Sequence, residues 1–208
     1  MKVLVDMPQA AHACYVMAHG AGAGMTHPFM EAVARGFAAH GIATLRYEFP
    51  YMEKGSKRPD TPAVAKAAVR EALAEAARRA PGLALFAGGK SFGGRMTSQA
   101  QADEALPGVK GLVFFGFPLH APGKPSDERA GHLSRVAVPM LFLQGTRDEF
   151  ATLDLLQPVV KRLGKRATLE LFEDADHSFH VPARTGRKDA DLRSEMLGKA
   201  AAWIRGLS

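Results

Sequence analysis

The amino-acid sequence predicts an α/β protein with a single domain over residues 1–208, in which helices cover both faces of a mostly parallel, doubly wound sheet. Three observations lead to this prediction. Short apolar runs of strand type alternate with segments whose apolar residues recur at helical spacing, as in strands joined by crossover helices. Neither an internal repeat nor a linker divides the chain. Its length of 208 residues suits one domain with a substantial core.

Six short apolar runs predict the strands of this sheet. They cover residues 14–18, 42–49, 83–87, 111–117, 139–144 and 168–172. The first run is followed by a glycine-rich loop from His19 to Gly24, and the third by a second glycine-rich segment from Gly88 to Gly94. Both glycine-rich segments are therefore expected at the ends of strands.

Five segments with apolar residues three or four positions apart predict helices. They cover residues 28–40, residues 62–79, a stretch that begins after Gly94, residues 152–163, and a C-terminal stretch that carries Leu192, Met196, Ala200, Trp203 and Leu207. Thr61 and Pro62 mark the start of the second helix, because a capping residue is followed by proline at the first helical position. Gly41 ends the first helix. The polar residues 50–60 are predicted to form a loop.

Charge and composition exclude several functions. The formal net charge is +6, but the basic residues are dispersed and aromatic residues make up only 8% of the chain. A nucleic-acid site needs a basic stripe with groups that stack on or read bases, so we expect none. No apolar segment is long enough to span a membrane, and Asp6 and Pro8 interrupt the region where a signal peptide needs its apolar core. The single cysteine, Cys14, fits a reducing compartment, and we expect a cytoplasmic protein.

The segment Gly89-Lys90-Ser91-Phe92-Gly93 is a G-x-S-x-G motif. In this motif the serine lies on a strained turn between a strand and a helix, which exposes its hydroxyl. Glycine is needed on either side because a Cβ atom there would crowd the turn. An apolar strand is predicted directly before the motif, and a helical segment follows it. Ser91 is therefore the candidate nucleophile.

The same residues also fit a relaxed phosphate-binding loop, with Ala84 in place of the first glycine. Such a loop needs its strand to end before the first small residue, so that backbone N–H groups can wrap phosphates. Ala84 instead lies inside the apolar run 83–87. No later strand ends in an aspartate that could help to hold magnesium. We therefore favour the nucleophile interpretation.

A serine nucleophile needs a general base, which is oriented in turn by a carboxylate. In α/β-hydrolases these groups follow one another along the chain as serine, acid and histidine, each on a loop after a strand. Asp148 follows the fifth predicted strand and is the candidate acid, with Glu149 as its alternative. His177 follows the sixth and is the candidate base, with His180 as its alternative. The spacing of the two histidines also occurs in metal sites, but no third ligand cluster is visible, so we expect no metal.

The oxyanion hole of such a site needs two backbone N–H groups that point at the developing negative charge. Phe92, directly after the nucleophile, is expected to supply one, and Ala21 in the first glycine-rich loop the other, with Gly22 as the alternative. Gly22 and His120 are also expected to bind substrate. Many lipases insert a helical lid after the fourth strand, where this chain has only a short segment, so little or no lid is expected.

Several motifs occur together in the order found in a known family. They are His19-Gly20-Ala21-Gly22, Tyr47-Glu48-Phe49-Pro50-Tyr51, Gly88-Gly89-Lys90-Ser91-Phe92-Gly93-Gly94-Arg95, Gly116-Phe117-Pro118-Leu119-His120, Leu143-Gln144-Gly145-Thr146-Arg147-Asp148 and Asp176-His177-Ser178. Over almost the whole chain they resemble the small dienelactone-hydrolase-like α/β-hydrolases. Within that family, the chain most resembles the branch that contains the testis-expressed hydrolase-like proteins and a subunit of the NSL histone-acetyltransferase complex.

The resemblance implies the single-domain α/β-hydrolase fold and a triad of Ser91, Asp148 and His177. Dienelactone hydrolases carry cysteine at the position of Ser91, which argues against dienelactone as the substrate. We expect a serine hydrolase that acts by acyl transfer on a small-molecule carboxylic ester and needs no cofactor. The alternatives are a thioesterase or small peptidase with the same triad, and a non-catalytic interaction module that retains the fold. The sequence leaves the oligomeric state open.

Overall fold

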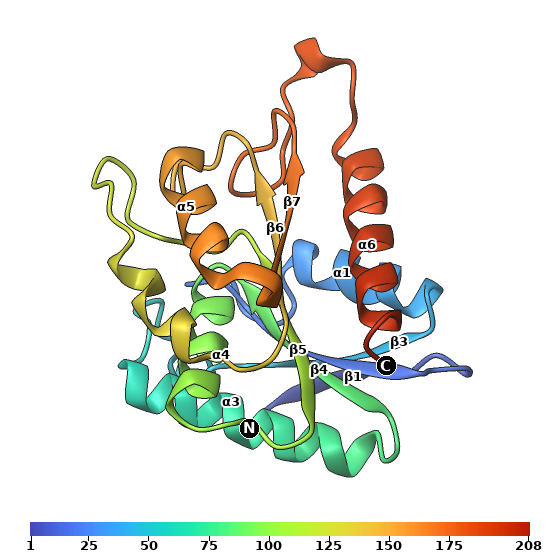
Figure 1. Cartoon of the computed structure of the whole chain (residues 1–208). Coiled ribbons are helices and arrows are strands. Elements are labelled where there is room, and N and C mark those ends of the chain that lie inside the picture. The colour runs from blue at the N-terminus through green and yellow to red at the C-terminus, as the bar shows by residue number, and fades with distance from the viewer.

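The computed structural model describes all 208 residues and contains one seven-stranded sheet with helices on both faces (Figure 1). The strands are β1 (Val3–Asp6), β2 (Ala13–Ala18), β3 (Ile42–Tyr47), β4 (Ala84–Lys90), β5 (Val109–Phe115), β6 (Met140–Gly145) and β7 (Ala167–Phe172). Their order in the sheet is β1-β3-β2-β4-β5-β6-β7. Every neighbouring pair is parallel except β1 with β3. The predicted fold class is confirmed.

The helices are α1 (Pro28–Ala39), α2 (Pro50–Glu53), α3 (Pro62–Arg79), α4 (Phe92–Asp103), α5 (Leu153–Leu163) and α6 (Asp189–Arg205). Buried residues of α3, α4 and α5 form one apolar core with one face of the sheet, and those of α1 and α6 form a second core with the other face. Successive side chains of β2 lie on opposite faces of the sheet: Cys14 and Val16 belong to the first core, and Tyr15 and Met17 to the second.

Two elements were not predicted from the sequence. β1 is a four-residue edge strand paired with β3, and its run is too short and too exposed to stand out as a strand. α2 occupies the start of residues 50–60, which we expected to be a loop. It forms because Pro50 has a backbone conformation suited to the first position of a helix. It is a single turn, and the rest of that segment is irregular.

The end of β4 packs against the backbones of both neighbouring strands. A Cβ atom on Gly88 would lie 1.9 Å from the carbonyl oxygen of Val113 in β5. One on Gly89 would lie 2.1 Å from the carbonyl oxygen of Ala18 in β2. The strand therefore continues through two glycines to Lys90, whereas the apolar pattern predicted an end at residue 87. This close packing fixes the position of the turn that follows β4.

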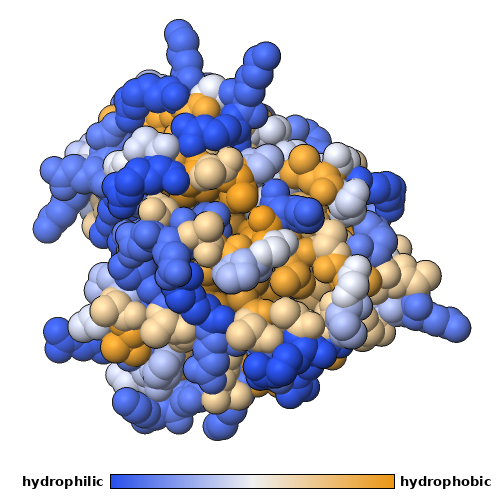
Figure 2. Space-filling model, turned by 60° about the horizontal axis from the view of Figure 1, so that its bottom comes forward, coloured by the Kyte–Doolittle hydropathy of each residue, from blue (hydrophilic) through white to orange (hydrophobic).

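The segment between β5 and β6 does not form a helical lid. Its only regular element is a 3-10 helix, Glu128–Arg135, whose Ala130 and Leu133 are buried in the core beside α4. The expectation of little or no lid is confirmed. Figure 2 shows one face of the surface, with hydrophilic side chains around much of its outline and apolar patches between them. No helix has both the length and the apolar character needed to cross a membrane.

Two helical glycines are expected to respond in opposite ways to alanine. In α4, a Cβ atom on Gly93 would lie 2.6 Å from the carbonyl oxygens of Ala18 and His19, so Gly93→Ala should lower the free energy of unfolding by about 1–3 kcal/mol. In α6, a Cβ atom on Gly198 would have no neighbour within 4 Å. Gly198→Ala should therefore raise the free energy of unfolding by about 0.5–1 kcal/mol. Urea unfolding followed by circular dichroism measures both. Equal stability of Gly93→Ala and the wild type would contradict the close contact.

Candidate active site

Ser91 lies on the sharp turn between β4 and α4. Its backbone angles, φ 49° and ψ −116°, are unfavourable for a residue with a side chain and cost about 1–3 kcal/mol. The surrounding packing holds this conformation, and the Ser91 N–H donates a hydrogen bond of 3.1 Å to the carbonyl oxygen of Phe115. Gly89 and Gly93 on either side have no room for a Cβ atom. The strained turn that the motif predicts is therefore present.

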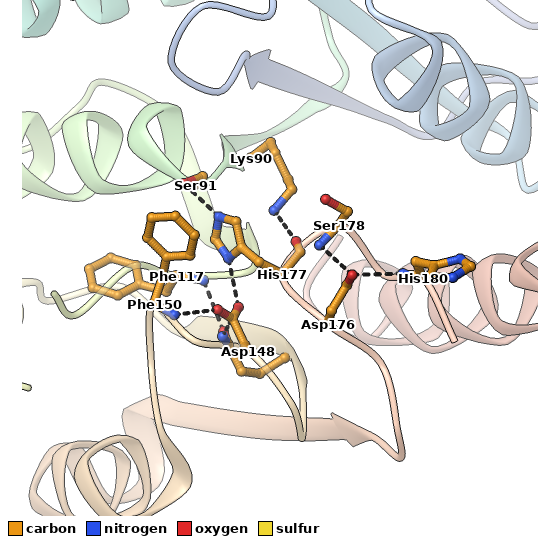
Figure 3. A network of polar contacts seen from close by, with 10 residues as sticks. Lys90, Ser91, Phe117, Asp148, Phe150, Asp176, His177, Ser178 and His180 are labelled. Atoms are coloured by element: carbon orange, nitrogen blue, oxygen red, sulfur yellow. Dashed lines mark hydrogen bonds and ion pairs between the residues drawn. The ribbon is translucent and has the colours of Figure 1, made fainter. Parts of the chain in front are cut away.

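A continuous chain of hydrogen bonds joins Ser91, His177 and Asp148 (Figure 3). Asp148 follows β6 and His177 follows β7, so the sheet brings three distant segments of the chain to one edge. The Nδ1 atom of His177 lies 2.7 Å from Oδ2 of Asp148, and Nε2 lies 2.9 Å from Oγ of Ser91. Because a carboxylate can only accept, Nδ1 carries the proton and the free Nε2 accepts from the serine hydroxyl. A base-activated serine needs this geometry.

The carboxylate of Asp148 is buried, and each of its oxygens is hydrogen-bonded by a further donor. Oδ2 accepts from the side-chain amide of Gln144 at 2.5 Å, and Oδ1 accepts from the Phe150 N–H at 2.8 Å. Gln144 in turn accepts from the Phe117 N–H at 2.9 Å, which orients its amide group. Glu149, the alternative acid, is exposed and takes no part in this network. The structure brings Asp148, and not Glu149, to His177.

Gln144 was not predicted as a site residue. The available signal was a polar residue at the end of an otherwise apolar run, directly before Gly145. Because it is fully buried in β6, its amide group needs hydrogen-bond partners inside the protein. Asp148 and Phe117 provide them.

Burial lowers the pKa of the His177 imidazole below its usual range, although the hydrogen bond from Nδ1 to Asp148 and the charge of Asp148 oppose that shift. The positive charge of Lys90 also lowers the pKa. The ring of Phe150 covers the imidazole, with ring centroids 4.3 Å apart. His177 is therefore neutral near pH 7 and able to accept a proton.

His180, the alternative base, lies outside this network. Its side chain is exposed, and its Nδ1 is 2.8 Å from a carboxylate oxygen of Asp189 at the start of α6. This hydrogen bond raises the pKa of His180. No group of three or more His, Cys, Asp or Glu side chains in the structure is arranged to hold a metal ion, and His177 and His180 bond to different carboxylates.

The loop after β2 contains a backbone donor suited to an oxyanion hole. The Ala21 N–H has no hydrogen-bond acceptor within the chain. The N–H of Gly22, the alternative donor, is already used in a 3.0 Å hydrogen bond to the hydroxyl oxygen of Tyr51. Phe92 begins α4, and the first N–H groups of a helix have no partner within the helix. The N–H groups of Ala21 and Phe92 therefore both lack an acceptor within the chain, and their role as oxyanion donors stays a prediction.

His19 fixes the start of this loop. Its Nδ1 lies 2.8 Å from the carbonyl oxygen of Gly20, and its Nε2 accepts a hydrogen bond of 3.1 Å from the Phe49 N–H. The imidazole is buried, and burial lowers its pKa, which favours the neutral form that these two contacts require. The loop is thus held by a side chain that bonds both to the loop backbone at Gly20 and to Phe49, the residue before α2.

A cavity of about 300 Å³ opens beside Ser91. Eleven residues line it: Gly20, Ala21, Ala23, His27, Phe29, Met30, Lys90, Ser91, Phe150, His177 and Ser178. The two predicted substrate-binding residues are not among them. The side chain of His120 is buried, with Nδ1 2.9 Å from the Ala121 carbonyl oxygen. Gly22 is exposed, and its N–H is hydrogen-bonded to the Tyr51 hydroxyl. Neither residue has a contact with the cavity.

The phosphate-loop interpretation does not fit the structure. Ala84 is the first residue of β4, and the strand continues to Lys90, so no loop precedes Ser91 that could wrap phosphates. The Lys90 side chain instead reaches the loop after β7, where Nζ donates a 2.5 Å hydrogen bond to the carbonyl oxygen of His177 (Figure 3). Burial lowers the pKa of Lys90 to about 8.

Comparisons with known proteins agree with this architecture. A family profile described as alpha/beta hydrolase domain matches residues 11–205, and the chain belongs to this family. One similar solved structure is an alpha-beta serine hydrolase homologue from Coxiella burnetii, with TM-score 0.77 and 20% identity over 95% of this chain and 90% of that chain.

Two further structures extend the likeness. An α/β serine hydrolase without lid from Xanthomonas campestris has TM-score 0.75 and 23% identity, and covers 97% of this chain and 88% of its own. A dienelactone hydrolase from Anabaena variabilis has TM-score 0.77 and 18% identity, and covers 99% of this chain and 91% of its own. The expected likeness to dienelactone hydrolases is confirmed at the level of the fold.

The two histidines of the loop after β7 should titrate on opposite sides of the ordinary imidazole pKa. His177 should lose its proton below pH 6.5, because burial opposes its charge, and His180 above pH 6.5, because Asp189 favours its charge. Imidazole NMR shifts recorded across pH measure both. In Asp189→Asn, the midpoint of His180 should fall while that of His177 stays unchanged. A common midpoint in the wild type would contradict the two environments.

Proposed function

We propose that the chain is a serine hydrolase that cleaves small carboxylic esters by acyl transfer. Ser91 is the nucleophile, His177 the general base and Asp148 the acid that orients the base. The observation that carries the proposal is the unbroken hydrogen-bond chain from Ser91 Oγ to the buried carboxylate of Asp148, on a strained turn beside an open cavity. A serine hydroxyl at its free pKa is a weak nucleophile, and this arrangement supplies the base that activates it.

The reaction follows from the positions of the groups. Nε2 of His177 takes the proton of Ser91 as Oγ attacks the ester carbonyl, and the Ala21 and Phe92 N–H groups stabilise the oxyanion. The imidazolium then gives its proton to the departing alcohol oxygen as the C–O bond breaks. Water, deprotonated by the same imidazole, then attacks the acyl carbonyl, the bond to Ser91 Oγ breaks, and the imidazolium returns its proton to Oγ as the acid leaves. Asp148 keeps the imidazole in the required tautomer and stabilises its charged form.

The choice of a small ester rests on the cavity and on the family. A volume of about 300 Å³ is at the small end of the range for ligand sites, and no lid encloses a larger space. Neighbouring structures include proteins described as a serine hydrolase without lid and a dienelactone hydrolase. The resemblance to the testis-expressed and NSL-complex branch rests on the sequence motifs. A cytoplasmic location, expected from the single cysteine, also stays a prediction.

Ser91→Ala should abolish ester hydrolysis and labelling by a fluorophosphonate probe, because the attacking oxygen is lost while the fold has room for alanine. Hydrolysis of p-nitrophenyl acetate and gel detection of the fluorescent probe measure the two losses. Ser178→Ala is the matched control, since Ser178 is an exposed serine beside the same cavity and should keep its labelling. Undiminished labelling of Ser91→Ala would overturn the assignment of the nucleophile.

The same variants distinguish the related enzyme classes. The wild type and Ser91→Ala are assayed on p-nitrophenyl esters, acyl-thioesters and aminoacyl amides of equal acyl length. The proposal predicts Ser91-dependent turnover that is fastest on the esters. Faster Ser91-dependent turnover of thioesters or amides would reassign the protein as a thioesterase or a peptidase. An absence of turnover on every substrate, together with an absence of labelling, would favour a non-catalytic interaction module.

Asp148→Asn should lower kcat by about 10⁴-fold with little change in the geometry, because asparagine presents a donor where the imidazole needs an acceptor. Glu149→Gln is the control and should retain nearly full activity, since Glu149 is exposed and outside the hydrogen-bond chain. Steady-state kinetics on the best ester substrate decide between them. A large loss in Glu149→Gln with a small one in Asp148→Asn would move the role of the acid to Glu149.

A further inference from the structure

One charged group in the cavity has no part in the proposed chemistry. Lys90 lies at the end of β4, directly before Ser91, and its side chain lines the cavity. Its ammonium donates to the carbonyl oxygen of His177 but forms no ion pair with a carboxylate, unlike Lys199, which pairs with Glu170 at 2.7 Å. An ammonium has three donors, so two remain for another acceptor.

The surrounding chain leaves space for this ammonium. A Cβ atom on Gly116 would lie 2.9 Å from Nζ of Lys90, so any other residue there would displace the charged head. Nζ also lies 5.9 Å from the ring centroid of Phe29 and 5.5 Å from that of Phe179. Aromatic faces attract a cation without neutralising it. Lys90 therefore lines the cavity and carries an ammonium that no carboxylate pairs with directly.

No carboxylate lines the cavity or forms an ion pair with this ammonium. The basic lining residues are Lys90, His27 and His177, and no lining residue is acidic. The carboxylates whose charges act on Lys90 are engaged elsewhere. Asp148 is bonded by His177, Gln144 and Phe150, and one oxygen of Asp176 accepts from the N–H groups of Ser178 and His180. With a pKa of about 8, Lys90 is still mainly protonated near pH 7.

We propose that Lys90 binds a free carboxylate carried by the substrate, so that the preferred substrates are small esters with a second, ionised carboxyl group. This inference rests on the proposed function and names the substrate class of the same site. The apolar side chains of Phe29, Met30 and Phe150 contact the carbon chain between the two groups. A carboxylate suits the site better than a phosphate does, because phosphate sites gather several charged donors and this cavity has one lysine.

Two pairs of esters test the proposal. Monomethyl glutarate is compared with methyl glutaramate, in which a neutral amide replaces the carboxylate on the acyl side. The acetyl ester of 4-hydroxybutyrate is compared with that of 4-hydroxybutyramide, for the alcohol side. The wild type should prefer the charged member of at least one pair by about tenfold or more in kcat/KM, since hydrogen bonds to charged groups are the strong ones. Lys90→Met should remove the preference, and Lys90→Arg should keep most of it.

Lys199→Met is the matched control and should keep the wild-type preference, since Lys199 pairs with Glu170 and does not line the cavity. Loss of activity on both members of a pair in Lys90→Met, with the preference intact, would mean that Lys90 only holds the His177 loop and would overturn the proposal. A wild type that shows no preference in either pair would also overturn the proposal. If that wild type still hydrolyses the amide-bearing esters in a Ser91-dependent way, the proposed function stands. If no ester is hydrolysed, both fail.

A measurement on the wild type alone covers the case in which Lys90→Met does not fold. Glutarate and glutaramide are compared as inhibitors of methyl valerate hydrolysis. Inhibition that is about tenfold stronger with glutarate supports a carboxylate site at Lys90. Equal inhibition by the two compounds overturns it.

Discussion

The close packing of β4 between β2 and β5 is the constraint on which the rest of the site depends. At Gly88 and Gly89 the neighbouring backbones come so near that no side chain fits, and the chain then turns sharply at Ser91. The serine can occupy an unfavourable conformation because the sheet and α4 hold the chain on both sides. The packing of the two cores thereby offsets the cost of about 1–3 kcal/mol of the Ser91 conformation and holds its hydroxyl beside the cavity.

The polar groups around Asp148 form a second requirement. Burying a carboxylate lowers the stability of the fold unless hydrogen bonds replace those that the carboxylate made to water. Gln144, the Phe150 N–H and His177 together provide these hydrogen bonds inside the protein. The same contacts leave His177 with one free nitrogen. Stability of the buried charge and orientation of the imidazole thus depend on the same few hydrogen bonds.

The central part of the fold could be read from the sequence because buried parallel strands are nearly continuous apolar runs. The edge strand β1 could not, since one of its sides is exposed and its partner β3 is far along the chain. At the site, Ser91, Asp148 and His177 were predicted from the order of loops after strands. Gln144 was missed because its role depends on how the loops after β5 and β6 bring the Phe117 N–H and Asp148 to its amide group. His120 was expected at the cavity although its side chain is buried.

The short connection between β5 and β6 has a kinetic consequence. Where a lid covers the active site, opening and closing take microseconds to milliseconds and often limit turnover. Here the segment folds back onto α4 and does not cover the cavity. In the proposed hydrolase, no lid movement would therefore precede substrate entry or product release. The proposed acyl-enzyme would likewise be exposed to water without an opening step.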